Sequence, residues 1–166
     1  MEHITLITTG GTIDKRYGVG LGVRDLYIGK PFALDFLMNM IGVNIKIDHT
    51  AQMSRDSLDF TDDDRTWVAQ MCKLAQADKI LITHGTDTMI QTAGFIHKSG
   101  IATRRTIVLT GALQPAIMRN SDAEFNLGLA LGACLSLHSG VYIAMNGVYR
   151  WDMCIKHPET GMFIPN

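Results

Sequence analysis

Strand-sized apolar runs alternate with helical segments along this chain, and that alternation limits the folds open to it. Five runs are rich in Ile, Val and Thr and have the length of buried strands: Ile4–Thr9, Val43–Ile47, Ile80–Thr83, Thr106–Thr110 and Val141–Met145. Successive strands separated by helices pair in parallel, with right-handed crossovers. The pattern therefore predicts an α/β fold, a three-layer sandwich around a mostly parallel, doubly wound sheet of the Rossmann or flavodoxin kind.

The starts of three helices are marked by residues typical of helix N-termini. Pro31 precedes an amphipathic stripe, and Thr61 stands before three aspartates that the helix dipole favours. Ser121 and Glu124 have the spacing of a capping box in front of the apolar helix Phe125–Ser136. Because that last helix is apolar on nearly every side, we expect it to be covered on more than one face. This predicts a homo-oligomer, a dimer or a tetramer.

Length and charge narrow the class of protein. The chain has 166 residues, 46% of them hydrophobic, which predicts a single domain over residues 1–166. A net charge of −1 offers no electrostatic footprint for nucleic acid. The N-terminus lacks the basic region of a signal peptide, and the longest apolar stretch, Leu127 to Leu137, is shorter than the ~18 residues of a membrane span. The sequence thus predicts a cytoplasmic protein without nucleic-acid or membrane partners.

The cysteines form no CxxC pair and are expected to be small core residues in a reducing compartment: Cys72, Cys134 and Cys154.

Three of the five predicted strands end in threonine and glycine. The segments are ITTGGT at Ile7–Thr12, ITHGTDT at Ile82–Thr88 and LTGA at Leu109–Ala112. Ligands of parallel sheets bind beyond the carboxyl ends of the strands, where glycine permits close approach and threonine supplies hydroxyls. Threonine and glycine also end strands without any function, but three such exits together favour one polar crevice.

The motifs of nucleotide and metal sites are missing from these exits. Gly10 and Gly11 are followed by neither GxGxxG nor GxxxxGK[ST] spacing, and the glycines of Gly18–Gly22 are more typical of a mobile flap. The six histidines form no HExxH or close ligand pair, and His84 is expected to be a hydrogen-bonded structural residue. We therefore expect neither a metal nor an organic cofactor.

With nucleotide and metal sites set aside, the remaining chemistry for these exits is nucleophilic attack by a threonine hydroxyl. A neutral hydroxyl attacks only when a base takes its proton and a further group holds that base. Thr86 and Asp87 supply a hydroxyl and a carboxylate side by side, and a lysine from elsewhere in the chain would complete a Thr–Lys–Asp relay. Lysine titrates near ~10.4, so its service as a base requires burial or a favourable local field.

Several segments together resemble the bacterial-type L-asparaginase family of threonine amidohydrolases. They are TTGGTID at Thr8–Asp14, THGTDTM at Thr83–Met89, LTGALQPA at Leu109–Ala116, SDAEFNLGLA at Ser121–Ala130 and GVYIAMNG at Gly140–Gly147. The match runs from residue 4 to about residue 163. It covers the amino-terminal α/β domain of the usual two-domain enzyme, so the sequence is similar to a short form without the carboxy-terminal asparaginase domain.

The resemblance implies that Thr12 is the threonine that attacks the side-chain amide. It makes Tyr17 the hydrogen-bonding neighbour on the flap, although Tyr27 lies on the same loop and is an alternative. Thr12 also follows two glycines, where threonine commonly serves only as a helix N-cap.

The second relay implied by the resemblance consists of Thr86, Asp87 and Lys156. The lysine follows Met145-Asn146 at nearly the family's distance, but the match needs a gap of one residue. A solvated surface lysine is the alternative for Lys156. Thr86 and Asp87 have an alternative as caps of the helix that follows them.

The resemblance also implies a set of substrate-binding groups. Backbone N–H groups near Gly11 and Thr86 would surround the oxyanion, with Gly85 as a further substrate-binding residue, and the carbonyl of Ala112 would hold the leaving amide. Ser57 would grip the substrate's α-carboxylate, whereas Leu58 stands where the family commonly has a polar residue. Leucine donates no hydrogen bond, so the preference for asparagine over glutamine stays open.

The sequence predicts a hydrolase that cleaves a small amide, with L-asparagine as the expected substrate and L-aspartate and ammonia as products. The intermediate would be an acyl-threonine. Two alternatives remain at this stage: a non-catalytic amino-acid sensor, and an amidase subunit that supplies ammonia within a larger complex.

Overall fold

The structure is a computed structural model that describes residues 1–18, 25–39 and 44–166. Its centre is a six-stranded sheet with the order β4-β1-β5-β6-β7-β8. The strands are β1 (Glu2–Thr8), β4 (Ile45–Gln52), β5 (Lys79–Thr83), β6 (Thr106–Thr110), β7 (Gly140–Ala144) and β8 (Val148–Arg150). The first five are parallel, and β8 pairs with β7 in antiparallel orientation. The predicted α/β fold with a mostly parallel sheet is confirmed.

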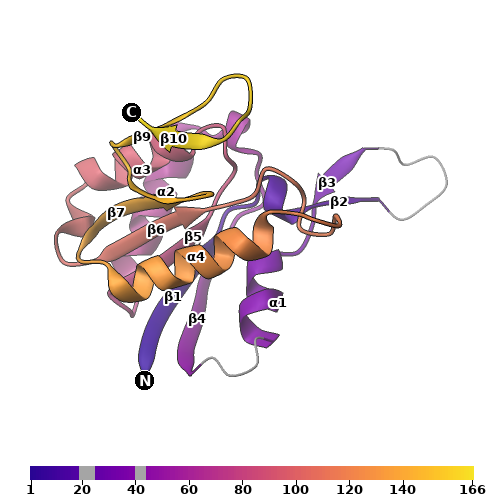
Figure 1. Ribbon diagram of the computed structural model, residues 1–166. Helices are drawn as coiled ribbons and strands as arrows, with labels where there is room; N and C mark the ends of the chain where they lie inside the picture. The colour runs from indigo at the N-terminus through magenta and orange to yellow at the C-terminus, as the bar shows by residue number, and fades with distance from the viewer. Residues whose placement is uncertain (19–24, 40–43) are drawn as a thin grey trace.

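Two pairs of helices cover the sheet, one pair on each face (Figure 1). Helices α2 (Asp62–Leu74) and α3 (Met89–Lys98) pack on one face, and α1 (Phe32–Asn39) and α4 (Ala123–Ser136) on the other. Each face of the sheet has its own hydrophobic core, and strand β5 contributes to both. Ile80 and Ile82 pack in the core under α2 and α3, and Leu81 packs in the core under α1 and α4. A central parallel strand is thus apolar on both sides.

Two short hairpins and three 3₁₀ turns complete the fold. The hairpins are β2 (Lys15–Tyr17) with β3 (Leu26–Ile28), and β9 (Cys154–Lys156) with β10 (Phe163–Pro165). The turns are η1 (Thr12–Asp14), η2 (Ser57–Asp59) and η3 (Ile101–Thr103). The β2–β3 hairpin extends away from the body of the domain (Figure 1). Most of the predicted flap, residues 19–22, lies outside the described residues, as does the start of the predicted second strand at Val43.

The two predicted helix caps have different outcomes. Thr61 caps α2 as predicted, and it forms a capping box with Asp64, in which each side chain accepts the other's backbone N–H. The predicted box of Ser121 and Glu124 is wrong, because α4 begins at Ala123 without a side-chain cap bond. Asp122 explains the difference: its carboxylate accepts the N–H groups of the loop that follows β6 and the side-chain amide of Asn126, and it caps no backbone N–H of α4.

The apolar character of α4 leaves hydrophobic surface on its outer side. Phe125 is 63% exposed, and space is open around the Cα atoms of Gly128 and Gly132.

All three cysteines are free and buried, which confirms the prediction that they are core residues. Within the described ranges, no helix combines the length and apolarity required to cross a bilayer.

Candidate active site

The three threonine- and glycine-rich exits lie side by side at the carboxyl edge of the sheet. Thr8, Thr83 and Thr110 are in register across β1, β5 and β6. The ladder continues one residue beyond the strands, since the Thr9 N–H donates to the Thr83 carbonyl at 3.1 Å and the His84 N–H to the Thr110 carbonyl at 2.8 Å. The exits therefore leave the sheet as adjacent, hydrogen-bonded loops.

Two glycines bring the first two loops into direct contact. A Cβ atom on Gly11 would stand 2.5 Å from the Cα atom of Gly85, a distance that side chains do not tolerate. Gly11 also has a φ of 87°, in the left-handed region that glycine adopts readily. Thr12 and Thr86 each follow one of these glycines, so the backbone contact places the two threonines on neighbouring loops.

Replacing Gly11 with alanine is expected to destabilise the fold by about 3 kcal/mol or more, because the clash and the strained backbone conformation add. Urea unfolding of the purified variant measures this. Gly128→Ala is the matched control: that glycine lies in α4 with open space around it, and the change should stabilise the protein by about 0.5–1 kcal/mol. Equal effects of the two changes would contradict the close approach of the loops.

Lys156 arrives from the far end of the chain and contacts both candidate residues after β5. Its Nζ atom lies 3.0 Å from Thr86 Oγ1 and 2.6 Å from Asp87 Oδ1. Thr86 is buried, while the carboxylate of Asp87 is 43% exposed and the side chain of Lys156 25% exposed. Because the lysine donates to Thr86 Oγ1, the hydroxyl hydrogen of Thr86 is free to point elsewhere. A hydroxyl, an amine and a carboxylate thus form one connected group.

Asn146 is a positioning residue that the sequence motifs did not identify. It follows β7 with a φ of 45°, and its backbone N–H donates to Asn126 Oδ1. Its side-chain amide exchanges two hydrogen bonds with the backbone of Phe163, the β10 partner of Lys156. Asn146 therefore ties the β9–β10 hairpin to the end of the sheet. An asparagine at the end of a predicted strand was the available signal, since asparagine tolerates positive φ.

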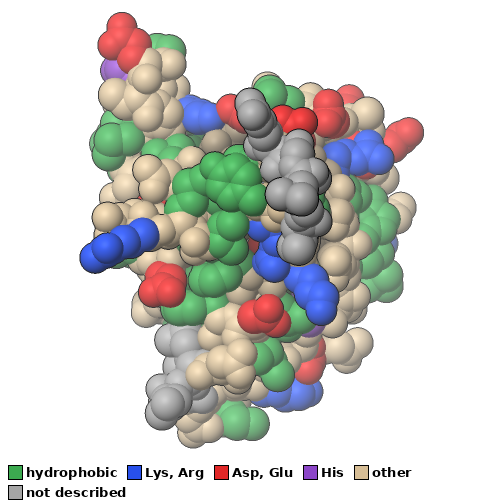
Figure 2. Space-filling model, turned by 90° about the vertical axis from the view of Figure 1, so that its right-hand side faces the viewer, with side chains coloured by type: hydrophobic (Ala, Val, Ile, Leu, Met, Phe, Trp, Pro, Cys, Tyr) green, Lys and Arg blue, Asp and Glu red, His purple; other side chains and the backbone are tan. Residues whose placement is uncertain are grey.

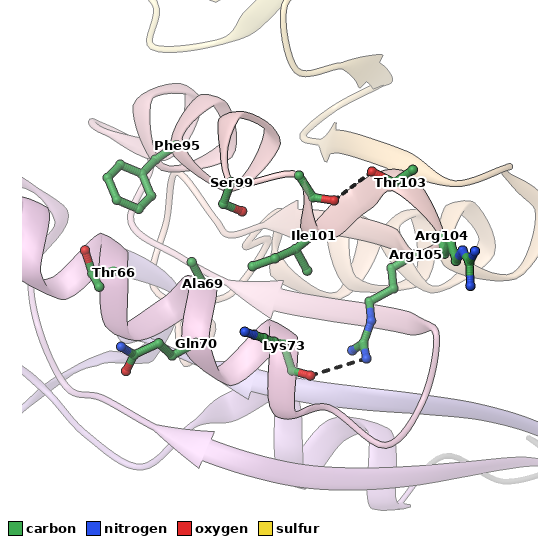
Figure 3. A pocket seen from close by; sticks show the side chains of 11 residues that line it. Thr66, Ala69, Gln70, Lys73, Phe95, Ser99, Ile101, Thr103, Arg104 and Arg105 are labelled. Carbon is green, nitrogen blue, oxygen red and sulfur yellow. Dashed lines mark hydrogen bonds between the residues drawn. The ribbon is translucent and has the colours of Figure 1, made fainter.

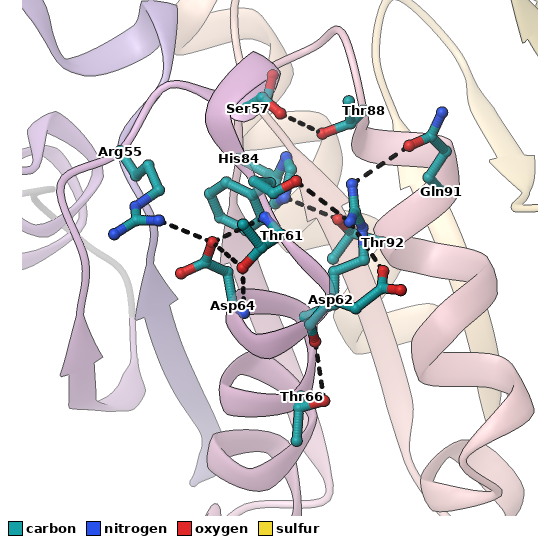
Figure 4. Close-up of polar contacts among 12 residues, drawn as sticks. Arg55, Ser57, Thr61, Asp62, Asp64, Thr66, His84, Thr88, Gln91 and Thr92 are labelled. Atoms are coloured by element: carbon teal, nitrogen blue, oxygen red, sulfur yellow. Dashed lines mark hydrogen bonds and ion pairs between the residues drawn. The ribbon is translucent and has the colours of Figure 1, made fainter.

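Ser57 lies under the loop that carries Asp87. The side chain has no exposed surface, and its hydroxyl accepts the backbone N–H of Asp87 at 3.2 Å. Its carbonyl accepts the hydroxyl of Thr88 at 2.7 Å (Figure 4). In this geometry Ser57 contacts the loop rather than open space, and direct contact with a substrate carboxylate requires a shift of η2. The next residue, Leu58, is 72% exposed.

Tyr17 lies on the β2–β3 hairpin and is 54% exposed. Tyr27, the alternative flap residue, is 48% exposed on the opposite strand. Figure 2 shows hydrophobic side chains gathered on the face of the molecule that bears this hairpin. An ion pair of 2.7 Å between Lys15 and Asp56 ties the base of the hairpin to the turn before Ser57. No hydrogen bond joins either tyrosine to Thr12 within the described ranges.

Ala112 is buried in the loop that follows β6. Asp122 accepts the N–H groups of the next two residues, and Asn126 donates to the Gly111 carbonyl at 3.1 Å. The Ile13 carbonyl accepts the Ala116 N–H, which joins this loop to the one that carries Thr12. Asp122 and Asn126 thus hold the third exit as structural residues, and the backbone bond from Ala116 to Ile13 joins that exit to the first.

The loops and side chains described so far belong to a segment with known relatives. Residues 3–153 match the model of the family described as "Asparaginase, N-terminal". The chain belongs to the asparaginase family. The resemblance derived from the sequence motifs is thereby confirmed.

Individual relatives agree with this assignment. The chain is 31% identical over 163 residues to a probable periplasmic L-asparaginase of Haemophilus influenzae, covering 88% of this chain and 43% of the relative. It is 28% identical over 174 residues to a glutamyl-tRNA(Gln) amidotransferase subunit of Methanococcus vannielii, covering 95% of this chain and 37% of that protein. The chain thus spans less than half the length of these curated relatives.

Solved structures of the family share the fold. The thermostable L-asparaginase from Thermococcus kodakarensis superposes with a TM-score of 0.79 at 26% identity, over 98% of this chain and 51% of that one. A probable cytoplasmic L-asparaginase from Campylobacter jejuni gives a TM-score of 0.76 at 24% identity, over 99% of this chain and 54% of that one. In both structures, the part that matches this asparaginase-family domain makes up about half of a longer chain.

His84 is a buried residue that hydrogen-bonds within the loop that follows β5 in this asparaginase-family domain. The ring has no exposed surface, and one of its nitrogens pairs with the Gly85 carbonyl at 2.8 Å. The other pairs with the Thr92 hydroxyl at 3.0 Å (Figure 4). Burial lowers the pKa of His84 to about 4, so the ring is neutral at physiological pH. The prediction of a structural, hydrogen-bonded histidine is confirmed.

Asp14 is a second buried titratable group near the Thr12 loop. Its Oδ1 atom accepts the Phe32 N–H at 2.7 Å, at the start of α1. Burial raises the pKa of the Asp14 carboxyl to about 6, against the opposing effects of that hydrogen bond and of the Arg16 charge. A proton therefore binds this carboxyl more tightly in the folded chain than in the unfolded chain.

Asp14→Asn is expected to stabilise the protein at pH 7 by up to about 3 kcal/mol, at ~1.4 kcal/mol for each pKa unit. The native Asp14 contributes stability that is fully present below its ordinary pKa of 3.8 and is lost as the pH rises through about 6. The advantage of the variant should therefore vanish near pH 4. Because the shifted pKa of His84 acts in the opposite direction over the same pH range, the free energy of unfolding must be compared with wild type at each pH. An advantage that is independent of pH would contradict this account.

Several hollows of this asparaginase-family domain lie away from the threonine loops. A cavity of about 590 Å³ lies between the C-terminal halves of α2 and α3, beside Phe95, Ile101 and Arg105 (Figure 3). A cavity of about 500 Å³ opens instead on Asp87, Lys156 and the β9–β10 turn. The chemistry of the side chains, rather than cavity size, identifies the second region as part of the candidate site. Over the described residues, no group of three or more His, Cys, Asp or Glu side chains is arranged to hold a metal ion.

Proposed function

We propose that this chain is an amidohydrolase that converts L-asparagine to L-aspartate and ammonia through an acyl ester on Thr12. The contact of Lys156 with both Thr86 and Asp87 carries the proposal, because it joins residues about 70 positions apart beside the Thr12 loop. A structural ion pair has no need of the buried threonine hydroxyl. Membership of the asparaginase family supports the same chemistry.

The proposed cycle has two halves. The Thr12 oxygen attacks the carboxamide carbon, its proton passes to the leaving nitrogen, and ammonia departs from the acyl ester. Water held near the Thr86 hydroxyl then attacks the ester carbon, with Lys156 as proton carrier, and the proton returns to the Thr12 oxygen. Backbone N–H groups at the Gly11 and Gly85 exits stabilise the negative oxygen in both halves, and Ala112 offers its carbonyl to the leaving amide.

The first experiment measures ammonia released from L-asparagine and from L-glutamine by the purified chain. Ammonia from asparagine supports the proposal. Binding of L-aspartate without any ammonia release from either amide would instead identify an amino-acid sensor. The outcome also gives the preference between the two amides, on which the exposed Leu58 bears directly.

A second candidate is an amidase subunit that supplies ammonia to a larger complex. The similarity to a subunit of an amidotransferase favours it. It predicts weak hydrolysis of free amides that increases when a partner protein is added. A high rate with free asparagine and no partner would count against this candidate.

The quaternary structure and the cellular location stay predictions. The outer face of α4 supports a homo-oligomer, since Phe125 is exposed and Gly128 and Gly132 leave room for a second helix. Similar proteins include one described as periplasmic and one described as probably cytoplasmic. We keep the cytoplasm as the expected location.

A further inference from the structure

The turn that joins β9 to β10 lies beside the side chain of Lys156. Its residues 157–161 line the cavity that opens on Asp87 and Lys156. The backbone of Gly161 faces the lysine, because a methyl group at its Cα atom would stand 3.7 Å from Lys156 Cε, in ordinary van der Waals contact. The turn therefore borders the stem of the proposed proton carrier.

The position of the Lys156 ammonium depends on its surroundings. The β9–β10 hairpin is a separate two-stranded sheet and does not pair with the six-stranded sheet. Asn146 anchors the hairpin on the β10 side, through the backbone of Phe163. On the β9 side, lysine has a flexible four-carbon stem that reaches several positions unless neighbouring atoms restrict it. The turn is the neighbour that follows Lys156 directly in the chain.

His157 closes this turn from within. Its Nδ1 atom accepts the backbone N–H groups of Glu159 at 3.2 Å and Thr160 at 3.3 Å. Since both partners are donors, Nδ1 carries no proton and the ring hydrogen lies on Nε2. The backbone of His157 adds two further bonds: its N–H donates to the Met162 carbonyl at 2.7 Å, and its carbonyl accepts the Gly161 N–H at 2.9 Å.

Three features together favour a single conformation of the turn. Pro158 fixes its own φ angle, and Gly161 adopts a φ of 71°, in the left-handed region. The imidazole of His157 supplies the third, because the Glu159 and Thr160 N–H groups have no other acceptor among the described residues. Without Nδ1 these exposed groups would bond to water, and the turn would no longer be held in one shape.

We infer that His157 is a positioning residue: its imidazole fixes the turn beside Lys156, and the turn keeps the ammonium on Thr86 and Asp87. The inference rests on the proposed function, in which Lys156 carries a proton. Loss of the imidazole acceptor would leave Lys156 in the chain but free its ammonium to move, so kcat should fall. The loops proposed to bind the substrate are elsewhere, so KM should change little.

The test compares two replacements of His157 in the purified full chain. Phenylalanine keeps a ring but has no acceptor, whereas asparagine keeps an oxygen that accepts N–H groups two and three residues further on. In steady-state assays with L-asparagine, His157→Phe should lower kcat at least about fivefold with KM within about twofold, and His157→Asn should stay within about twofold of wild type. His138→Phe, the same change at an exposed histidine before β7, should leave kcat unchanged.

A double variant separates positioning from a general loss of structure. In the Lys156→Met protein, His157→Phe should lower the remaining kcat by less than about twofold, because its effect passes through the lysine. If instead the loss has the same size with and without Lys156, His157 does not act through that residue and the inference is overturned. Equal losses in His157→Asn and His157→Phe would overturn it as well.

Amide exchange with water, measured by NMR, reads the turn without catalysis. Exchange at Glu159 and Thr160 should be at least about threefold faster in His157→Phe than in wild type, and unchanged in His157→Asn. Equal exchange in His157→Phe and wild type would overturn the inference. A wild-type chain that releases no ammonia would refute the proposed function instead, and the exchange rates would then decide the role of His157 in the turn.

Discussion

A Thr12→Ala protein is expected to release ammonia from L-asparagine at least about 10⁴-fold more slowly than wild type, the scale seen when an enzyme loses its nucleophile. The side chain stands one residue beyond the contact between Gly11 and Gly85, at the junction of the first two loops. Its hydroxyl is the only side-chain nucleophile that the proposed cycle uses. The methyl group of alanine fits the same space, so binding of L-aspartate and the unfolding temperature should change little.

The matched control is Thr88→Ala. Thr88 lies on the neighbouring loop, and its hydroxyl donates to the Ser57 carbonyl. Losing that bond should cost about 0.5–1.5 kcal/mol of stability without a comparable loss of turnover. Steady-state ammonia release and urea unfolding separate the two effects. A Thr12→Ala protein with the wild-type rate would refute the assignment of the nucleophile.

Lys156→Met is expected to lower kcat by a factor of about 10²–10⁴, which is the range for removal of a proton-transfer group. Methionine preserves most of the apolar length of lysine but contacts neither Thr86 nor Asp87 through a charged nitrogen. The ion pair is partly exposed, and such pairs contribute about 0–1 kcal/mol to stability, so the fold should persist. Stopped assays of ammonia release at several pH values report the change in rate.

Lys79→Met is a closely matched control at the opposite end of the sheet. The Lys79 side chain is 26% exposed and pairs with Glu2 at 2.6 Å, nearly the burial and geometry of the Lys156–Asp87 pair. Its loss should leave kcat unchanged. If the two methionine variants lose the same activity, the role of Lys156 is structural and the relay is wrong.

Local signals in the sequence predicted the structure better than distant ones. The strands β5, β6 and β7 begin and end within one residue of their predicted bounds, because their apolar runs are short and are bounded by polar residues. The cap of α2 also follows from adjacent residues, since Thr61 and Asp64 contact one another directly. The cap predicted for α4 fails because Asp122 has partners in a loop eight and nine residues earlier, which no local pattern reveals.

The sequence by itself determined the α/β class through its hydrophobic periodicity, and the convergence of the threonine-rich exits followed because parallel strands end at one edge of a sheet. It determined the resemblance to the family through short motifs. All of these signals lie within short stretches of chain. Only the tertiary structure decided that Ser57 is buried under the loop that carries Asp87, and that Arg65 borders a cavity between α2 and α3, away from the threonine loops. It likewise decided where Lys156 lies, through Asn146 and the pairing of β9 with β10. These contacts join segments far apart in the chain, and their geometry depends on how the whole core packs.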